Sequence, residues 1–258
     1  MFINKLPSLG NVVGGSTATL DCPVGMTYDA IKFAYSGVTD AQMTDIELLI
    51  NGRPVMQYKD AVELKALNDY YGRPDAAGEM TMHFRRPELI EAQRAFPGLG
   101  TADIDTLQIR IKIDAAAASP VISASAQLSP AQPLGVFVKV RYLNANYATA
   151  GKQEMPNIPR GGRVLAMHLF KADVDNVEVE VNNRRVMEGD KATFESYQKG
   201  AGRKPQSAKA THIDWSLYGD LGRALVTDGV QDFRIRPTIA TSGSIRTVIE
   251  YVDGFEGV

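Results

Sequence analysis

The sequence predicts an all-β protein built as a double jelly roll, two tandem eight-stranded antiparallel sandwiches with a few short helices. Three observations lead to this fold class. Many short runs alternate apolar and polar residues, helical patterns are few, and one order of elements occurs twice. The 258 residues suffice for two domains of average size. Eight strands joined by long crossing connections favour a jelly roll over a simple meander.

The predicted strands come from period-two alternation, which places apolar side chains on one face of a strand and polar ones on the other. Gly, Pro, Asn and Asp bound most of these runs, as expected for strands packed as a sandwich. The runs are Thr17–Cys22, Ile46–Ile50, Met80–Phe84, Leu107–Ile113, Val121–Ala126, Val136–Tyr142, Val164–Leu169, Val177–Val181, Ile213–Leu217, Phe233–Arg236 and Ile245–Tyr251.

Four segments carry helical patterns. Asp60–Tyr70 has apolar residues at helical spacing and Asp60 as its N-cap. Pro87–Phe96 begins with a proline suited to a first turn and ends before Pro-Gly. Ala192–Gln198 is long enough for two turns, and Gly219–Val226 is a shorter candidate.

The internal repeat defines the domain organisation. Ile46–Met56 aligns with Val177–Met187 at an offset of 131 residues, and both read as a strand, Asn-Gly or Asn-Asn, Arg, one residue, then Val-Met. Asn-Gly and Asn-Asn suit the positive φ angles of a tight hairpin turn. Phe84 meets Trp215 at the same offset. The sequence therefore predicts two homologous domains.

The domain boundary is expected near Ser129–Pro133, a proline-marked linker. This gives a first jelly roll with an N-terminal arm over residues 1–130 and a second over residues 131–258. Gly151–Gly162 is then a loop inside the second. The arm, Met1–Gly15, is mostly apolar or small, and we expect it to order only against another surface.

Composition excludes several classes of protein. A net charge of −2 argues against a protein that binds nucleic acid through bulk positive charge. Cys22 is the single cysteine, so neither an internal disulfide nor a multi-cysteine zinc site can form; we expect it to be a small buried hydrophobe. The sequence shows no signal-peptide h-region and no run of 18 apolar residues, so we expect folding in a cytosol.

The histidines do not form a recognised site. His83, His168 and His212 lie in predicted strands without HxH or HxxxH spacing. A catalytic or metal role would need them to converge with carboxylates. We interpret them as structural residues that satisfy local hydrogen bonds.

Two carboxylate pairs lie at loop-to-strand boundaries, Asp103 with Asp105 and Asp173 with Asp175. Such pairs could start a calcium site or act as glycosidase acids, but solvated loop acids are the favoured interpretation.

Two basic features also have a structural interpretation. Arg85-Arg86 is interpreted as a solvated strand end. Lys199–Lys209, with four basic residues and no acid, is interpreted as an exposed flexible loop, with lipid phosphate or a neighbouring subunit as the alternative. The chain contains no Gly-x-Ser-x-Gly elbow and no phosphate-binding Gly-x-x-x-x-Gly-Lys-[Ser/Thr] loop, so no catalytic residues are assigned.

The chain resembles the corticovirus major capsid protein family, the coat proteins of tailless, membrane-containing bacteriophages. The resemblance covers nearly the whole chain in order, and its motifs are structural. It is weaker in the second half, and it does not extend to Gln198–Lys209. The matching segments are Gly25–Thr39, Ile50–Lys59, Phe84–Glu88, Ile113–Gln127, Ala166–Leu169 and Ile249–Tyr251.

The resemblance implies a double jelly roll that forms trimers with six jelly rolls in a pseudo-hexagonal capsomer. It implies an icosahedral shell around a lipid membrane that holds double-stranded DNA. The expected partners are neighbouring trimers, vertex (penton) proteins and the internal membrane or its proteins, without direct contact to nucleic acid. Structural calcium is associated with such shells, but no ligand motif can be carried over, so the metal ligands stay unknown.

The function predicted from the sequence is a non-enzymatic viral major capsid protein of the virion, assembled in the host cytoplasm. The alternative is a carbohydrate-binding or carbohydrate-active tandem jelly roll, which needs clustered aromatics beside convergent acids. Trp215 is the single tryptophan, and the repeat places it in the core, which argues against an aromatic surface on which a sugar ring could stack. Residues 1–130 hold 11 Lys and Arg against 15 Asp and Glu, a net charge of −4, and residues 131–258 hold 17 against 15, a net charge of +2. In a ring in which first and second domains alternate, domains of unlike charge would therefore be neighbours.

Overall fold

The computed structural model describes residues 2–93, 98–155 and 157–257, and it divides into two compact units between Val140 and Arg141. This division is compatible with two domains, and the boundary near Ser129–Pro133 stays a prediction. None of the helices in the described ranges has the length and apolar character needed to cross a membrane.

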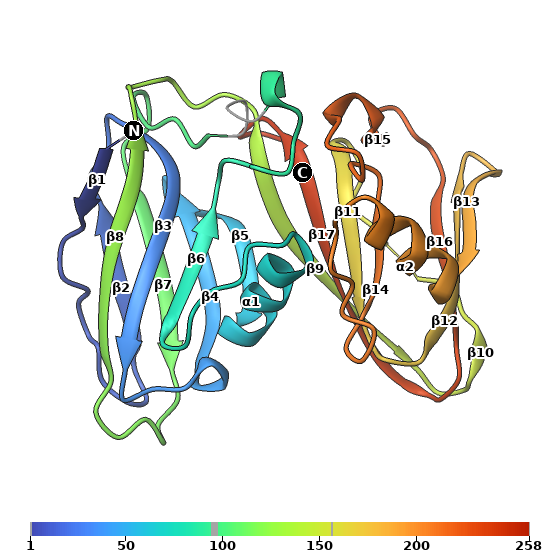
Figure 1. Ribbon diagram of the computed structural model, residues 1–258, viewed down its shortest axis with the longest axis horizontal. Coiled ribbons are helices and arrows are strands. Elements are labelled where there is room, and N and C mark those ends of the chain that lie inside the picture. Colours follow the sequence, from blue (N-terminus) through green and yellow to red (C-terminus); the bar gives the residue numbers. More distant parts are fainter. Residues whose placement is uncertain (1, 94–97, 156, 258) are drawn as a thin grey trace. The chain divides into compact units, whose positions relative to one another are not determined.

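The first unit is a sandwich of two four-stranded antiparallel sheets (Figure 1). One sheet has the order β1-β8-β3-β6, and the other four strands lie side by side as β2-β7-β4-β5. The strands are β1 (Phe2–Lys5), β2 (Thr17–Cys22), β3 (Thr27–Ser36), β4 (Met43–Ile50), β5 (Arg53–Asp60), β6 (Glu79–His83), β7 (Leu107–Ile113) and β8 (Val121–Ser129).

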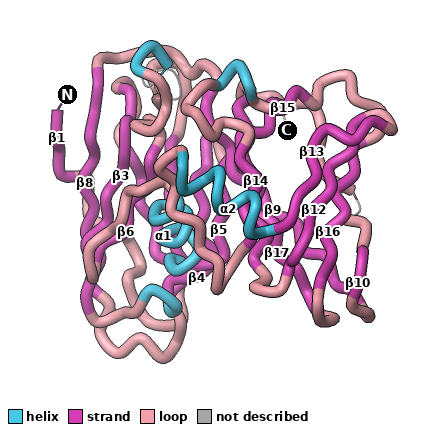
Figure 2. The backbone as a smooth tube through the Cα atoms, turned by 45° about the vertical axis from the view of Figure 1, so that its right-hand side comes forward, coloured by secondary structure: helices cyan, strands magenta, loops and turns pink. Residues whose placement is uncertain are grey.

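The second unit repeats this arrangement strand for strand. Figure 2 shows its strands β10, β16, β12 and β13 side by side. The sheets of this unit have the orders β9-β17-β11-β14 and β10-β16-β12-β13, with the short β15 added beside β11. The strands are β9 (Phe137–Tyr147), which begins in the first unit, β10 (Gly151–Lys152), β11 (Arg163–Phe170), β12 (Val174–Val181), β13 (Arg184–Asp190), β14 (Thr211–Asp214), β15 (Leu225–Val226), β16 (Phe233–Ile239) and β17 (Gly243–Asp253).

This connectivity places the first strand of each unit beside its last, and the second strand beside the seventh, which is the winding of a jelly roll. The predicted fold class is therefore confirmed. Each core lies between its two sheets because alternate residues of every strand turn inward. The core of the second unit includes Val177 and Val179 of β12, Ile235 of β16 and Ile249 of β17.

The repeated hairpin has the same register in both units. Leu48 pairs with Met56 and Ile50 with Arg53, while Val179 pairs with Met187 and Val181 with Arg184. Each hairpin also has a register shift at the same place, between Leu48 and Leu49 and between Val179 and Glu180. The prediction that Ile46–Met56 and Val177–Met187 occupy equivalent strands agrees with this pairing.

The turn of each hairpin depends on one asparagine. Asn51 (φ 49°) and Asn182 (φ 48°) adopt the left-handed conformation that Asn tolerates better than most residues. The Asn182 side-chain oxygen accepts hydrogen bonds from the backbone N–H groups of Gln231 (3.0 Å) and Asp232 (3.1 Å). Asn51 accepts in the same way from Asp105 and Thr106. The asparagine thus ties each hairpin to the loop before the neighbouring strand.

Replacing Asn182 by Ala is expected to lower the free energy of unfolding of the second unit by about 2 kcal/mol, because two hydrogen bonds are lost and Ala disfavours positive φ. Urea unfolding followed by the fluorescence of Trp215, the single tryptophan, measures this. Asn183→Gly is the control, since Asn183 also has positive φ (62°) and Gly52 occupies the same place in the first hairpin. Equal stability of Asn182→Ala and the unmodified chain would contradict the role of the side chain.

Both units place a ten-residue helix after the hairpin, and each helix has an Asp N-cap. Helix α1 (Ala61–Tyr70) follows Asp60, which accepts from the N–H of Glu63, and α2 (Lys191–Gly200) follows Asp190, which accepts from the N–H of Thr193. These are the helices predicted at Asp60–Tyr70 and Ala192–Gln198. Each one packs near the edge of its own sandwich, α1 against β5 and β6 and α2 against β12, β13 and β14.

Two other helix predictions were wrong in the described residues. The segment Pro87–Phe96 forms a 3-10 turn at Glu91–Gln93, and its last three residues lie outside the described ranges. It packs through Leu89 while the adjacent Ile90 is exposed, so it lacks a continuous apolar helix face. The segment Gly219–Val226 forms one 3-10 turn at Leu221–Arg223, capped by Asp220, before β15. Gly222 weakens any longer helix there.

The prediction for the N-terminal arm was also wrong. Phe2–Lys5 forms β1, which pairs antiparallel with β8 of the same chain, and Leu6 is buried. Main-chain hydrogen bonding to a sheet edge therefore orders the segment without another molecule. The side chains of Phe2 and Ile3 nevertheless stay exposed.

Candidate functional site

Two of the three histidines meet inside the second unit. His168 of β11 and His212 of β14 are paired across the strands, both are buried, and their Nδ1 atoms lie 2.7 Å apart. The backbone N–H of Gln206 donates to Nε2 of His212 (3.2 Å). Burial, then His168 and Lys191, hold the pKa of His212 well below its usual value, so this histidine is neutral at pH 7. The interpretation as residues that satisfy local hydrogen bonds fits this pair, although the sequence did not show that the two histidines meet.

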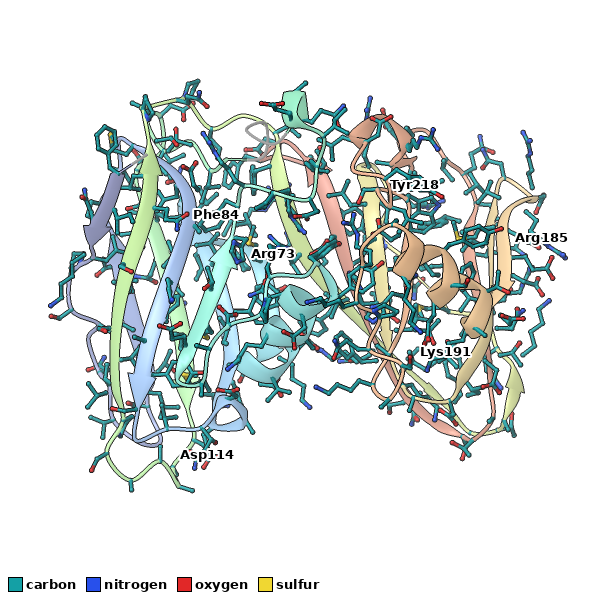
Figure 3. The ribbon with its side chains drawn as sticks, in the orientation of Figure 1. Arg73, Phe84, Asp114, Arg185, Lys191 and Tyr218 are labelled. Carbon is teal, nitrogen blue, oxygen red and sulfur yellow. The ribbon has the colours of Figure 1, made fainter. Side chains whose placement is uncertain are left out.

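His83 lies apart from that pair, at the end of β6 in the first unit. Burial, followed by the positive charges of Arg73 and Arg86, lowers its pKa to about 3. The guanidinium groups of Arg73 and Arg86 lie 5.0 and 4.9 Å from the centre of the Tyr71 ring. Figure 3 marks Arg73 near the end of β6. His83 is thus a neutral residue beside two fixed cations.

The Arg85-Arg86 pair is held by ion pairs. Arg86 is buried and donates to Glu88 (3.3 Å), and Arg85 forms an ion pair with the buried Asp29 (2.6 Å) and donates to Ser129. The interpretation as a solvated strand end was therefore wrong for Arg86, whereas the Arg85 side chain is 41% exposed. A buried guanidinium needs charged partners, and Arg86 finds one in Glu88, two positions along the chain.

One member of each predicted carboxylate pair, Asp173 and Asp103, binds donors within its own unit. Asp173 accepts hydrogen bonds from Thr241 and forms an ion pair with Lys171 (2.6 Å). Partial burial opposes ionisation, but these donors lower the pKa of Asp173 to about 2. Asp103 accepts from the N–H of Leu134 (2.6 Å), and Asp175 and Asp105 are exposed.

These acids do not fit a calcium site. The Asp173 carboxylate already faces the Lys171 ammonium group, which disfavours a second cation, and calcium needs six to eight oxygen ligands. Within residues 2–93, 98–155 and 157–257, no group of three or more His, Cys, Asp or Glu side chains could hold a metal ion.

The basic segment Lys199–Lys209 is anchored at its centre. Arg203 is buried, its Nε lies 2.9 Å from the Asp214 carboxylate, and its Nη2 donates to the backbone oxygen of Ser216 (3.1 Å). Lys199, Lys204 and Lys209 are exposed around it. The three lysines are exposed as predicted, but Lys199 lies in the last turn of α2 and not in a loop, and Arg203 is buried.

Cys22 and Trp215 occupy structural positions. Cys22 is buried, and burial together with Asp21 raises the pKa of its thiol to about 12. Trp215 is partly buried and packs against the core of the second unit. Cys22 is therefore confirmed as a buried hydrophobe, and Trp215 does not form an exposed stacking platform.

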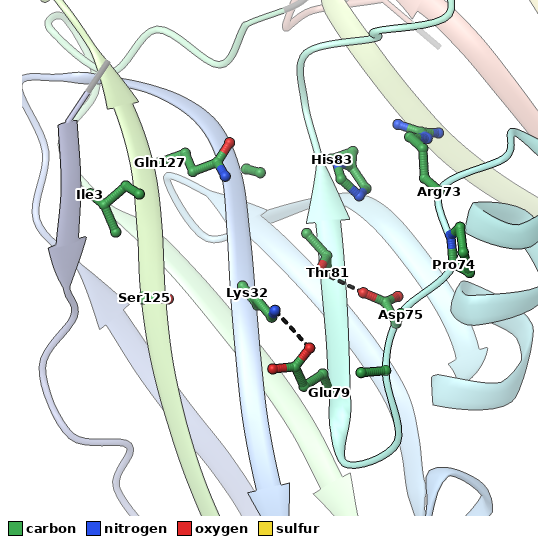
Figure 4. A pocket seen from close by; sticks show the side chains of 12 residues that line it. Ile3, Lys32, Arg73, Pro74, Asp75, Glu79, Thr81, His83, Ser125 and Gln127 are labelled. Carbon is green, nitrogen blue, oxygen red and sulfur yellow. Dashed lines mark hydrogen bonds and ion pairs between the residues drawn. The ribbon is translucent and has the colours of Figure 1, made fainter.

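A hollow of about 410 Å³ lies on the outer face of the sheet β1-β8-β3-β6 (Figure 4). Ile3 of β1 and the Lys32–Glu79 ion pair (2.6 Å) line it, and so does His83. Asp75 accepts a hydrogen bond from Thr81 inside it (2.6 Å). A second hollow of about 370 Å³ continues along the same face past Lys5. Charges of both signs are already paired here, so the lining does not select a ligand of one charge.

Two sheet edges expose apolar side chains. Phe2 and Ile3 of β1 are 55% and 66% exposed, and Val186 of β13 is 42% exposed. Edge strands with bare apolar residues are unusual on proteins that stay monomeric, because they invite pairing with another chain. These edges are the candidate functional surface. The sequence signal for β13 was the repeated Val-Met, whereas no predicted strand covered β1.

Comparison with known proteins matches both halves of the chain to one family. A family model described as "Viral coat protein P2 N-terminal domain" matches residues 3–129, and "Viral coat protein P2 C-terminal domain" matches residues 137–255. "Major capsid protein P2" of Pseudoalteromonas phage PM2 is 30% identical over 264 residues, which cover 97% of this chain and 96% of that protein.

Solved structures agree. The crystal structure of the major capsid protein P2 from bacteriophage PM2 has a TM-score of 0.94 at 28% identity and covers 100% of this chain and 99% of its own. The STIV major capsid protein has a TM-score of 0.73 at 11% identity, covering 97% and 96%, which shows likeness of fold alone. The chain belongs to the viral coat protein P2 family and is a viral major capsid protein with a double jelly-roll fold.

Proposed function

We propose that three copies of this chain form a pseudo-hexameric capsomer, and that such capsomers tile an icosahedral shell around an internal lipid membrane. The observation that carries this proposal is the internal repeat: one chain holds two jelly rolls with the same sheet orders and the same hairpin register. Three copies provide six similar units, which can surround an axis with similar contacts between neighbours.

The proposed partners are neighbouring capsomers, vertex (penton) proteins and the internal membrane or its proteins. Capsomers assemble in the host cytoplasm, and the shell does not contact nucleic acid directly. The near-neutral net charge of −2 supports the last point. The exposed lysines of Lys199–Lys209 provide positive charge for lipid phosphate or for a neighbouring subunit.

The proposed role is structural and non-enzymatic. Asp103 and Asp173, the acids considered for glycosidase chemistry, each bind backbone or side-chain donors of their own unit. The matching experiment is an assay of glycan and ester hydrolysis. Turnover that disappears in Asp103→Asn or Asp173→Asn would overturn the proposal.

The purified protein is expected to be a trimer of about 84 kDa, three times the chain mass of 28.1 kDa. Size exclusion coupled to light scattering, at low and at roughly molar salt, tests this. Because salt screens ion pairs but not apolar contacts, we expect the trimer to survive high salt. A monomer of about 28 kDa under both conditions would contradict the proposed assembly.

A further inference from the structure

The equivalence of the two units identifies which strands correspond. β5 and β13 are the outer strands of equivalent sheets and the second strands of the repeated hairpins. β1 and β9 are likewise equivalent, since each is the first strand of its jelly roll and lies beside the last strand, β8 or β17. Because the two strands of each pair have the same place in the fold, a difference in burial between them reflects which segments lie next to each strand.

One member of each pair has a buried stretch, at Val55–Met56 of β5 and Phe137–Val140 of β9, and these two stretches touch. Within the first unit, Met56 of β5 pairs in parallel with Val140 of β9. Val55 and Met56 are at most 2% exposed, and Phe137–Val140 at most 1%. The outer edge of β5 is thus covered by residues 137–140.

The other member of each pair is bare but keeps apolar residues. Val186 and Met187 repeat the Val-Met of β5, yet Val186 is 42% exposed, and Met187 is only partly buried against the core of its own unit. Phe2-Ile3 of β1 resembles Phe137-Val138 of β9, yet all four residues of β1 are exposed. Apolar side chains kept on an exposed strand edge indicate a partner that adds a strand there.

We propose that β13 of one copy pairs in parallel with β1 of the next copy, as β5 pairs with residues 137–140 within one chain. This inference rests on the proposed trimer and assigns its contact. Each copy offers one β13 edge and one β1 edge, so the contact is heterologous and closes into a ring when the rotation allows. The occupant of both edges is a second copy of this chain.

The hollows beside β1 support the same partner. The outer face of the sheet β1-β8-β3-β6 carries a hollow of about 410 Å³ lined by Ile3 (Figure 4). A second hollow of about 370 Å³ on the same face is lined by Lys5. On the equivalent sheet of the second unit, His168, Val248 and Glu250 are at most 3% exposed. A copy that adds its β13 along β1 lies next to these hollows.

Crosslinking with a short bis-maleimide tests the contact in the full chain. The variant Ile3→Cys/Val186→Cys is expected to give covalent dimers and trimers on a denaturing gel, and nothing larger than a trimer. Cys22 is buried with its thiol pKa raised to about 12, so it contributes little background. The control pair Ile3→Cys/Lys152→Cys uses the exposed β10, at the opposite end of the second unit's sheet, and is expected to stay uncrosslinked.

Light scattering separates the two proposals. If the Ile3→Cys/Val186→Cys variant is a trimer by light scattering but is not crosslinked, this inference is overturned. Equal crosslinking of the control pair overturns it as well. In both cases the proposed trimer itself is not contradicted. A monomeric unmodified chain overturns the proposed assembly itself.

A charge at the edge provides an independent readout. Val186→Asp is expected to give a folded monomer by circular dichroism and mass, whereas Val13→Asp, at an exposed valine outside both edges, stays trimeric. A Val186→Asp trimer as stable to dilution as the unmodified trimer would overturn the inference.

Discussion

Replacing Asp214 by Ala is expected to lower the free energy of unfolding of the second unit by about 3–5 kcal/mol. The side chains of Arg203 and Asp214 are 4% and 0% exposed, and their closest atoms lie 2.9 Å apart. Removing the carboxylate leaves a buried guanidinium without its counter-charge, and that cost exceeds the net value of the pair. The Ser216 hydroxyl, which donates to Asp214 (2.8 Å), loses its acceptor as well.

Urea unfolding followed by Trp215 fluorescence measures this effect beside the substituted position, at a fixed protein concentration. Lys199→Ala is the matched control because Lys199 belongs to the same basic segment, but its ion pair with Glu195 is largely exposed on the lysine side. We expect less than about 0.5 kcal/mol from that control. A change of similar size in both variants would contradict a structural role for the buried pair.

Acidification from pH 7 to pH 4 is expected to destabilise the first unit by about 3 kcal/mol through His83 alone. Burial, Arg73 and Arg86 lower its pKa from 6.5 to about 3. Below pH 6.5, His83 is protonated in the unfolded chain but stays neutral in the folded chain. The free energy of unfolding therefore falls by about 1.4 kcal/mol per pH unit until pH 3. The depressed pKa of His212 adds a loss of the same sign in the second unit.

His83→Gln removes this titration. The variant is expected to lose about 3 kcal/mol less than the unmodified chain between pH 7 and pH 4, measured by urea unfolding with far-ultraviolet circular dichroism. At pH 7 the two proteins are expected to differ by less than about 1 kcal/mol, since the histidine is neutral there. The same pH-dependent loss in both proteins would show that His83 titrates normally.

How much the sequence predicts depends on whether a feature is local. Strands with one buried face, such as Thr17–Cys22 and Leu107–Ile113, coincide with β2 and β7 because alternation directly records which face is inside. β3 (Thr27–Ser36) was not among the alternating runs, because its first five residues are all buried and include Asp29. Its charge is stabilised by Arg85, 56 positions later in the chain, a contact that no local pattern contains.

By itself, the sequence determined the double jelly roll, the equivalence of the hairpins, the first helix with its Asp60 cap and the place of the second helix. These follow from alternation, from the repeat with its Asn turns, and from helical spacing behind an Asp N-cap. The cap of the second helix, Asp190, was found only in the structure. The tertiary structure decided that His168 meets His212, that Arg203 is buried against Asp214, and that β1 and β13 are bare while their counterparts are covered. Those outcomes depend on which strands become neighbours, and distant residues then set the burial and charge of each side chain.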